Sequence, residues 1–184
     1  MAVGGVAVYP ADTVYGLACD PQSREAVERL YLLKRRRPDK PAAVMFFDVE
    51  LALEALPELP ARTREALRAL LPGGVTLLLP NPAGRFPLAG GGEVLGLRVP
   101  DGPLRGVRWP VLQSSANRSG GSDPRRLDDV PEFIRDSADL VLDAGELPGT
   151  PSTVVDLRDY ERDGLWSIVR EGAVPRATVE AALS

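Results

Sequence analysis

The sequence predicts an α/β (α+β) fold, in which one layered domain holds a twisted, mixed β-sheet flanked by helices. The length of 184 residues suits one domain, and a chain of this size buries roughly 70% of the surface it exposes when unfolded. Short apolar runs are mixed irregularly with helical patterns, without the strict strand–helix alternation of a doubly wound fold. No internal repeat or linker divides the chain. Residues 1–184 are therefore expected to form a single domain.

The expected elements follow one another along the chain. Residues 6–9 form an apolar strand that ends at Pro10, and Ser23 caps a helix expected over residues 23–37. Asp48 caps a short helix that reaches residue 56, and Pro60 opens another that reaches residue 71. Further strands are expected over residues 42–47, 75–79, 94–99, 111–114, 140–142, 153–157 and 166–170, with helices over 128–137 and from Pro175 onward.

The composition excludes several classes of function. Histidine is absent, which removes Ser-His and Cys-His dyads, histidine bases and histidine metal ligands. Cys19 is the only cysteine, so neither a disulfide framework nor a thiolate cluster is expected. No apolar run approaches the roughly 20 residues that span a bilayer, and no signal peptide is evident. The net charge of -4 argues against a protein whose main function is to bind nucleic acid. A cytoplasmic location is expected.

Four polar clusters lie beside predicted strands or helices, at residues 10–17, 34–41, 113–121 and 149–153. The second contains both lysines of the chain, Lys34 and Lys40, and could bind a polyanion such as a nucleotide triphosphate. Each cluster alone also fits a structural interpretation: a tight turn, a solvated helix end or a polar surface loop. Arg98 and Arg170 fall in apolar strands, where an unpaired guanidinium is costly, so each is expected to face an anion.

Seven segments in sequence order resemble a known family. They are Tyr9-Pro-Ala-Asp-Thr-Val-Tyr-Gly-Leu17, Lys34-x-Arg36 with Lys40-Pro41, Pro72-Gly-Gly-Val-Thr76-Leu, Gly96-Leu-Arg98-Val-Pro100, Ser115-Ala-Asn117-x-Ser119-Gly120, Pro151-Ser-Thr-Val-Val-Asp156 and Val169-Arg170-Glu-Gly172. With them the chain resembles the YrdC-like family, the threonylcarbamoyl-AMP synthases, from about residue 5 to residue 172. One such segment could be a coincidence, whereas seven in order are specific.

The resemblance implies a YrdC-like layered domain and a reaction. L-threonine, bicarbonate and ATP would give threonylcarbamoyl-AMP and pyrophosphate, and partner proteins would consume the product in the t6A modification of tRNA. Contact with tRNA or double-stranded RNA is a further expectation. Magnesium is expected with ATP, bound to its phosphates rather than at a metal site of the protein.

The resemblance also implies roles for individual residues. Threonine would be held by Thr13, Arg98, Ser115 and Ser152, with Tyr15 shaping the same pocket. The nucleotide would be held by Lys34, Arg36, Lys40, Asn117 and Arg170, with Lys34 and Arg36 as catalytic residues. Lys34 is expected to be a surface cation that contributes little to folding.

The chain departs from the family's usual residues at four positions. Ala11 replaces a threonine, Met45 a histidine, Gly74 a proline and Gly102 a histidine, which leaves the affinity for threonine open. The chain starts only a few residues before the first predicted strand, so the leading helix that is common in the family is not expected. It ends at Ser184, so the additional C-terminal domain of some members is not expected either.

Two other functions remain open at this point. One is a non-catalytic RNA-binding module that uses residues 35–40 and the glycine-rich loop 84–92, although few aromatic side chains are available for base stacking. The other is a carbamoyl-transfer domain like those of hydrogenase-maturation proteins, which occur fused to further domains.

Overall fold

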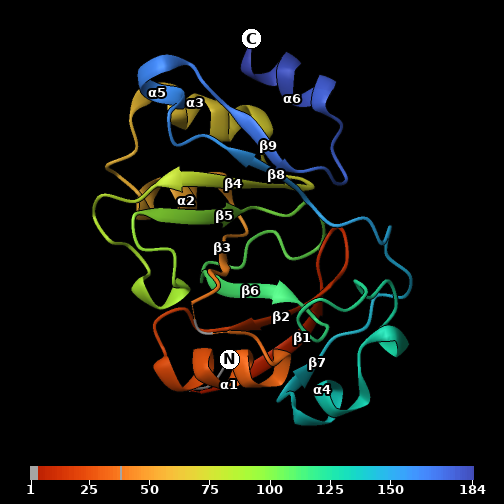
Figure 1. Ribbon diagram of the computed structural model, residues 1–184. Helices are drawn as coiled ribbons and strands as arrows, with labels where there is room; N and C mark the ends of the chain where they lie inside the picture. Colours follow the sequence, from red (N-terminus) through yellow and green to blue (C-terminus); the bar gives the residue numbers. More distant parts are fainter. Residues whose placement is uncertain (1–3, 38) are drawn as a thin grey trace.

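The computed structural model describes residues 4–37 and 39–184 of the chain (Figure 1). Over these residues the strands form one nine-stranded sheet in the order β7-β1-β2-β6-β3-β5-β4-β8-β9, with parallel and antiparallel pairs. The mixed sheet and its helices confirm the predicted α/β (α+β) class. The strands are β1 (Val6–Pro10), β2 (Tyr15–Cys19), β3 (Ala43–Met45), β4 (Val75–Pro80), β5 (Val94–Arg98), β6 (Val111–Ser115), β7 (Leu140–Val141), β8 (Thr153–Asp156) and β9 (Ser167–Arg170).

Strand β2 corrects the expectation that residues 10–17 form a polar cluster after the first strand. The chain turns within residues 11–14 and returns as β2, which pairs antiparallel with both β1 and β6. All five residues of β2 are buried, so the alternation that marks a half-exposed strand is missing from the sequence. Gly16 lies opposite Tyr9, and a Cβ at this glycine would lie 2.8 Å from the Tyr9 ring, which explains the glycine.

Helix α1 (Arg24–Lys34) begins where the sequence predicts and ends earlier. The Ser23 side chain accepts a hydrogen bond from the backbone N–H of Ala26 and caps the helix. Arg35 then adopts the left-handed conformation, with φ of 48°, and donates its N–H to the carbonyl of Leu32. This ends the helix before residue 37 and aims the following residues back toward the sheet.

The remaining helices match the predicted positions in most cases. The predicted helix over residues 128–137 is divided by Pro131, because the residue before a proline is driven out of the helical region. A short helix at Tyr160 was not predicted. The helices are α2 (Val49–Ala55), capped by Asp48, α3 (Ala61–Leu70), α4 (Glu132–Ser137), α5 (Tyr160–Asp163) and α6 (Arg176–Leu183), with 3-10 turns at Pro87–Ala89 and Leu127–Asp129.

Figure 1 shows α1 and α4 toward one end of the sheet and α3, α5 and α6 toward the other. Helix α1 packs beside β1 and β2, whereas α3 packs against α5 and α6 near the other end. The main core includes Leu30 of α1, Leu67 of α3 and Leu97 of β5, each without exposed surface. No helix in the described residues is long and apolar enough to cross a membrane.

Candidate functional site

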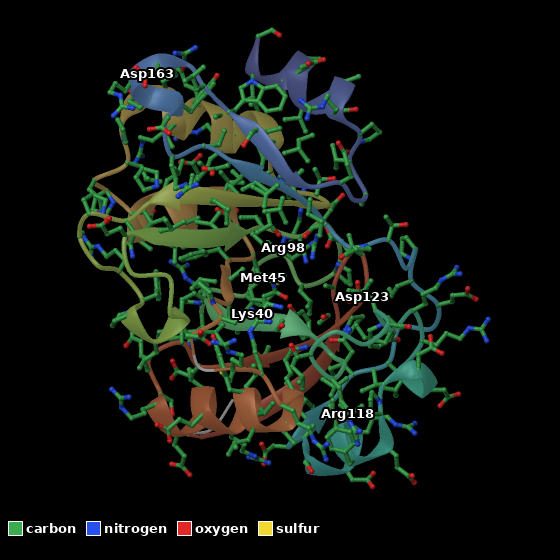
Figure 2. All side chains as sticks on the ribbon, viewed as in Figure 1. Lys40, Met45, Arg98, Arg118, Asp123 and Asp163 are labelled. Atoms are coloured by element: carbon green, nitrogen blue, oxygen red, sulfur yellow. The ribbon has the colours of Figure 1, made fainter. Side chains whose placement is uncertain are left out.

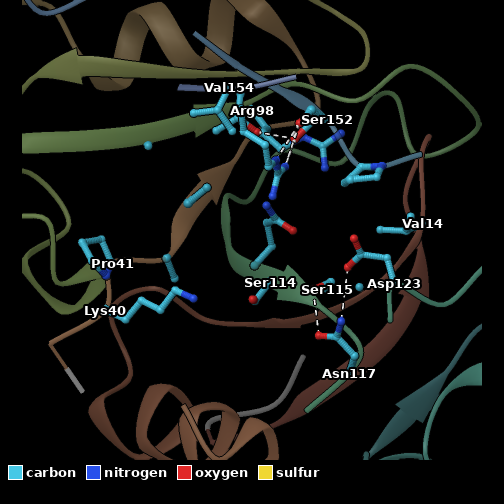
Figure 3. Close-up of a pocket in the computed structure, with 18 of the residues that line it drawn as sticks. Val14, Lys40, Pro41, Arg98, Ser114, Ser115, Asn117, Asp123, Ser152 and Val154 are labelled. Carbon is cyan, nitrogen blue, oxygen red and sulfur yellow. Dashed lines mark hydrogen bonds between the residues drawn. The ribbon is translucent and has the colours of Figure 1, made fainter. Parts of the chain in front are cut away.

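A cavity of about 440 Å³ lies over the middle of the sheet (Figure 3), a volume in the range of small-molecule sites. Seven strands contribute residues to its lining, and Ala43 of β3, Leu78 of β4 and Gly96 of β5 lie on its floor. Gly96 and Ala43 are cross-strand neighbours, so the floor has no bulky side chain at that point. The loop 115–123 and the chain that follows α1 form the walls.

The cavity is strongly positive although the whole chain carries a net charge of -4. Among the described residues, five cationic side chains and one carboxylate, that of Asp123, line it. Figure 2 places Arg98, Lys40 and Asp123 around the middle of the molecule, between α1 and the central strands. This concentration of charge favours an anion with several negative groups. The five cations are Lys34, Arg36, Lys40, Arg98 and Arg170.

Lys34 is buried, which corrects the expectation of a surface cation. Only 1% of the residue is exposed. Its ammonium group donates to the carbonyl oxygen of Ser115, and to the carbonyl oxygen and Oδ1 of Asn117, both at 2.9 Å. Three acceptors match the three N–H donors of an ammonium group. Lys34 therefore joins the end of α1 to the loop 115–123.

Burial lowers the pKa of Lys34 to about 7, because desolvation disfavours the charged amine. The nearby positive charge of Arg36 lowers it further, whereas the carboxylate of Asp123 raises it. The protonation of Lys34 is therefore expected to change near neutral pH, with a consequence for stability.

The difference in unfolding free energy between the native protein and a Lys34→Met variant is expected to rise from pH 7 to about pH 9. Below pH 7 the lysine is protonated in folded and unfolded chains alike, and its contribution stays constant. Above pH 7 the unfolded chain, with the ordinary pKa of 10.5, binds more protons, so native stability increases by up to roughly 1.4 kcal/mol per pH unit. Urea unfolding at several pH values measures this difference; a constant difference would contradict the lowered pKa.

Asn117 organises the loop that borders the cavity. Its Oδ1 accepts hydrogen bonds from Lys34 and from the Ser115 hydroxyl, at 2.9 Å each. Its amide nitrogen donates to the carbonyls of Gly121 and Ser122, at 2.8 and 3.0 Å. The side chain predicted to bind nucleotide thus fixes the loop in this state.

Arg36 and Lys40 lie on the opposite wall. Arg36 donates to the carbonyls of Lys40 and Pro41, and its guanidinium lies 5.8 Å from the centroid of the Tyr31 ring. Lys40 is exposed and lines the cavity (Figure 3). Backbone carbonyls thus hold Arg36 in place, whereas the Lys40 ammonium group has no hydrogen-bond or ion-pair partner among the described residues.

Arg98 faces an anion of the protein, as predicted for a guanidinium in an apolar strand. Its Nη2 lies 2.6 Å from Oδ1 of Asp12 and 3.4 Å from the hydroxyl of Thr13. Its Nε is buried without a hydrogen-bond partner among the described residues. Asp12 belongs to the first family-like segment, but its pairing with Arg98 could not be read from the sequence. Arg98, which lines the cavity, therefore keeps one N–H donor that no group of the described residues satisfies.

Arg170 and Ser152 lie together at the end of β9 and the start of β8. Arg170 donates to the carbonyl oxygen of Ser152 at 2.7 Å and to its hydroxyl at 3.2 Å. Thr76, which was not predicted as a site residue, shares a hydrogen bond of 2.7 Å with the same hydroxyl. Burial lowers the pKa of Arg170, and the charge of Asp123 opposes that shift. The polar group thus formed borders the cavity beside Arg98.

Tyr15 does not line the cavity. Its side chain is fully buried, and its hydroxyl lies 2.8 Å from both Oδ1 of Asp143 and the carbonyl oxygen of Gly145. The expectation that this ring shapes a threonine pocket therefore has no contact to support it. The backbone of Tyr15 does help to position the site, because its carbonyl accepts the N–H of Ala116 at 2.8 Å.

The four positions at which the chain departs from the family's usual residues lie in different surroundings. Ala11 lines the cavity directly, whereas Met45 is buried and accepts a hydrogen bond from the Tyr9 hydroxyl at 3.0 Å. A Cβ at Gly74 would lie 2.9 Å from the Ala173 side chain, so any side chain there requires that neighbour to move. Gly102 adopts φ of 125°, a conformation that favours glycine.

The chain is similar to proteins of one family over nearly its whole length. It matches the Sua5/YciO/YrdC family, described as telomere recombination, over residues 1–172. The threonylcarbamoyl-AMP synthase of Hahella chejuensis is 32% identical over 161 residues, 83% of this chain and 87% of that protein. That of Stutzerimonas stutzeri is 35% identical over 166 residues, 86% and 89% of the two chains. The structure of P. abyssi Sua5 complexed with L-threonine superimposes with a TM-score of 0.83 at 26% identity, covering 97% of this chain and 54% of that one.

The fold and the cavity define an α/β domain with a cation-lined cavity over the middle of a mixed sheet. The chain belongs to the Sua5/YciO/YrdC family. It spans most of the two bacterial relatives and about half of the archaeal Sua5.

Proposed function

We propose that the protein is a threonylcarbamoyl-AMP synthase, a nucleotidyltransferase that uses L-threonine, bicarbonate and ATP. The observation that carries the proposal is a cavity that five cations and one carboxylate line, counted over the residues that the structure describes, in a chain of net negative charge. The names of the relatives and the threonine complex of P. abyssi Sua5 support the choice of substrate. We place the activity in the cytoplasm, where ATP and tRNA occur.

The reaction suits a site without histidine. Threonine and bicarbonate give a carbamate and release water. A carbamate oxygen then bonds to the α-phosphorus of ATP, the bond from that phosphorus to the oxygen bridging to the β-phosphate breaks, and pyrophosphate leaves. Because the nucleophile is already an anion, the main requirements are positioning and neutralisation of charge, which the cations of the cavity can supply.

The cavity divides into two proposed parts. Arg98, with its unused donors, binds the carboxylate of threonine beside Thr13 and Ser152. Arg36 and Lys40 bind the phosphates from the opposite wall, and Arg170 contributes charge between the two parts. Lys34 and Asn117 already bind each other, so in this state they position the loop, and they reach the nucleotide only by exchanging these partners.

Magnesium is proposed to enter with ATP. No group of three histidine, cysteine, aspartate or glutamate side chains in the described residues could hold a metal ion. Only one carboxylate lines the described part of the cavity, which agrees with an ion that binds phosphate oxygens and keeps most of its water ligands. The ion would neutralise phosphate charge, while the side chains of the protein position the substrates.

Pyrophosphate release tests the proposal directly. Purified protein with ATP and magnesium is expected to release pyrophosphate only when threonine and bicarbonate are both present. Release that does not depend on threonine would indicate a different acceptor. A protein that releases none and binds neither ligand would not be a synthase.

A Ser115→Ala variant is expected to lower the affinity for threonine about tenfold and to leave ATP binding nearly unchanged. The Ser115 hydroxyl lies in the cavity and donates to Asn117, while the bond from Lys34 goes to the Ser115 carbonyl, which the variant retains. Calorimetric titration with each ligand measures both affinities. An equal loss for ATP would show that the hydroxyl serves the nucleotide part.

The structural surroundings disfavour a non-catalytic RNA-binding module. In the stretch 34–40, Lys34 is buried and Arg37 pairs with Asp39 at 2.6 Å. Arg36 is held by backbone carbonyls, so the stretch does not present a continuous basic surface. We propose that contact with tRNA or double-stranded RNA, and with the proteins that consume the product, is secondary to catalysis.

A further inference from the structure

Asp123 is an unexpected group in a cavity suited to anions. It is the only carboxylate among the described residues that line the cavity, and it lies in the loop after β6. Figure 3 shows its carboxylate pointing into the hollow, toward the region bordered by Arg98 and Ser152. A negative charge at this point weakens the binding of every phosphate group nearby. The position is therefore expected to serve a ligand group that carries positive charge.

The hydrogen bonds that Asp123 forms within the protein use only a small part of the acceptor capacity of its carboxylate. One oxygen, Oδ1, accepts from the amide nitrogen of Asn117 at 3.2 Å. That nitrogen has two protons and already serves two closer carbonyls, those of Gly121 and Ser122. Oδ2 has no hydrogen-bond partner, and the carboxylate forms no ion pair within 4.0 Å, in the part of the chain that the structure describes. The loop therefore leaves most of the acceptor capacity of Asp123 unused.

We propose that Asp123 binds the α-ammonium group of the amino-acid substrate while Arg98 binds its carboxylate. The inference rests on the proposed function and identifies the feature that selects an amino acid over other small anions. A free amino acid carries one charge of each sign, and the cavity offers a guanidinium and a carboxylate with unused capacity for each. The charges of Asp123 and Arg98 both act on Arg170, which agrees with their meeting in one region of the cavity.

An ammonium group suits this carboxylate better than a magnesium ion does. Magnesium requires a nearly octahedral set of oxygen ligands, and no second acidic side chain lines the described part of the cavity. Lys34 and Arg170 lie close enough for their charges to interact with Asp123, and they repel a divalent ion more strongly than a single ammonium group. A carboxylate and one or two hydroxyl or carbonyl oxygens are sufficient for an ammonium group.

The placement has a consequence for the proposed reaction. When the ammonium form of threonine reacts with bicarbonate, the nitrogen gains a carboxyl group, and one water and one proton are released. The nitrogen then has no positive charge, and the new carbamate is an anion. Asp123 repels that anion, whereas the cations around the phosphates attract it. The same carboxylate would thus bind the substrate and release the carbamate toward the nucleotide.

An Asp123→Asn variant tests whether the carboxylate of Asp123 binds the ammonium group of threonine. The amide can still accept the bond from Asn117, so the loop is retained. Calorimetry should show at least a tenfold loss of affinity for threonine, in keeping with the loss of a charge-assisted hydrogen bond. Affinity for the hydroxy-acid analogue, with a hydroxyl in place of the amino group, should stay the same or increase. Affinity for ATP without magnesium should increase, because a negative charge is removed from beside the phosphates.

Asp128→Asn is the matched control, because it changes the net charge equally at a side chain that is 92% exposed and outside the cavity. It should alter none of the three affinities. Unchanged threonine affinity in Asp123→Asn would overturn the proposal, as would equal losses for threonine and the hydroxy acid. Weaker binding of magnesium–ATP alone would identify Asp123 as a metal ligand instead. If the native protein binds ATP but the threonine affinity does not depend on Asp123, only this inference fails; if it binds neither ligand, the proposed function fails as well.

Discussion

A Lys34→Met variant is expected to lose stability and ATP use together. Methionine fills similar space but removes a donor from three acceptors on Ser115 and Asn117, and the carbonyl of Asn117 is left with no other hydrogen-bond donor among the described residues. Breaking a buried charged contact of this kind costs on the order of 3 kcal/mol, which for a chain of this size lowers the melting temperature by roughly 6–12 °C. The loop 115–123 loses its tie to α1, so ATP-dependent pyrophosphate release should fall at least a hundredfold. Thermal unfolding and initial rates measure the two effects.

Lys40→Met provides the contrast, because the same substitution is made at a lysine that lines the cavity and is exposed. It should weaken ATP binding about tenfold and leave the melting temperature within about 1 °C, since exposed charges contribute little to stability. Equal melting temperatures for the two variants would show that Lys34 is not the tie between helix and loop that its contacts indicate.

An Arg98→Lys variant is expected to lower kcat/KM for threonine at least a hundredfold while ATP affinity changes less than threefold. The variant keeps the positive charge beside Asp12, which is only 11% exposed, so the fold is retained. A lysine presents one compact ammonium group and cannot pair with Asp12 and also offer a fork to the substrate carboxylate. Two charge-assisted contacts at about 1.5–3 kcal/mol each account for an effect of this size.

Arg105→Lys is the control, because Arg105 pairs with Asp101 at the surface and both side chains are more than half exposed. It should leave the kinetics unchanged. If Arg98→Lys weakened ATP and threonine equally, Arg98 would belong to the phosphate part of the cavity, and the division of the site would need to be redrawn.

Helices whose first residues include a capping side chain could be predicted from the sequence. Ser23 and Asp48 mark helix starts through capping side chains that the structure confirms. Strand β2 could not be predicted, because full burial removes the alternation on which such a prediction depends. The early end of α1 depends on Arg35 in a left-handed conformation, which usually calls for glycine, and the sequence offers no such sign.

The candidate site, too, could be predicted from the sequence only in part. The family-like segments bring Arg98, Ser115 and Ser152 to one cavity, and their binding of threonine stays a prediction. Which side chains of the cavity form hydrogen bonds or ion pairs with one another depends on distances that the sequence does not contain. For this reason Lys34 was expected at the surface, Asp12 was not recognised as the partner of Arg98, and Asp123 was not recognised at all.

The central claim is that one cavity binds ATP and threonine together. Calorimetric titration of ATP, with and without threonine in bicarbonate buffer, tests it most directly. We expect ATP to bind at least about fivefold more tightly when threonine is present, the lower end of typical coupling between two ligands. No heat of binding for ATP under either condition would contradict the account.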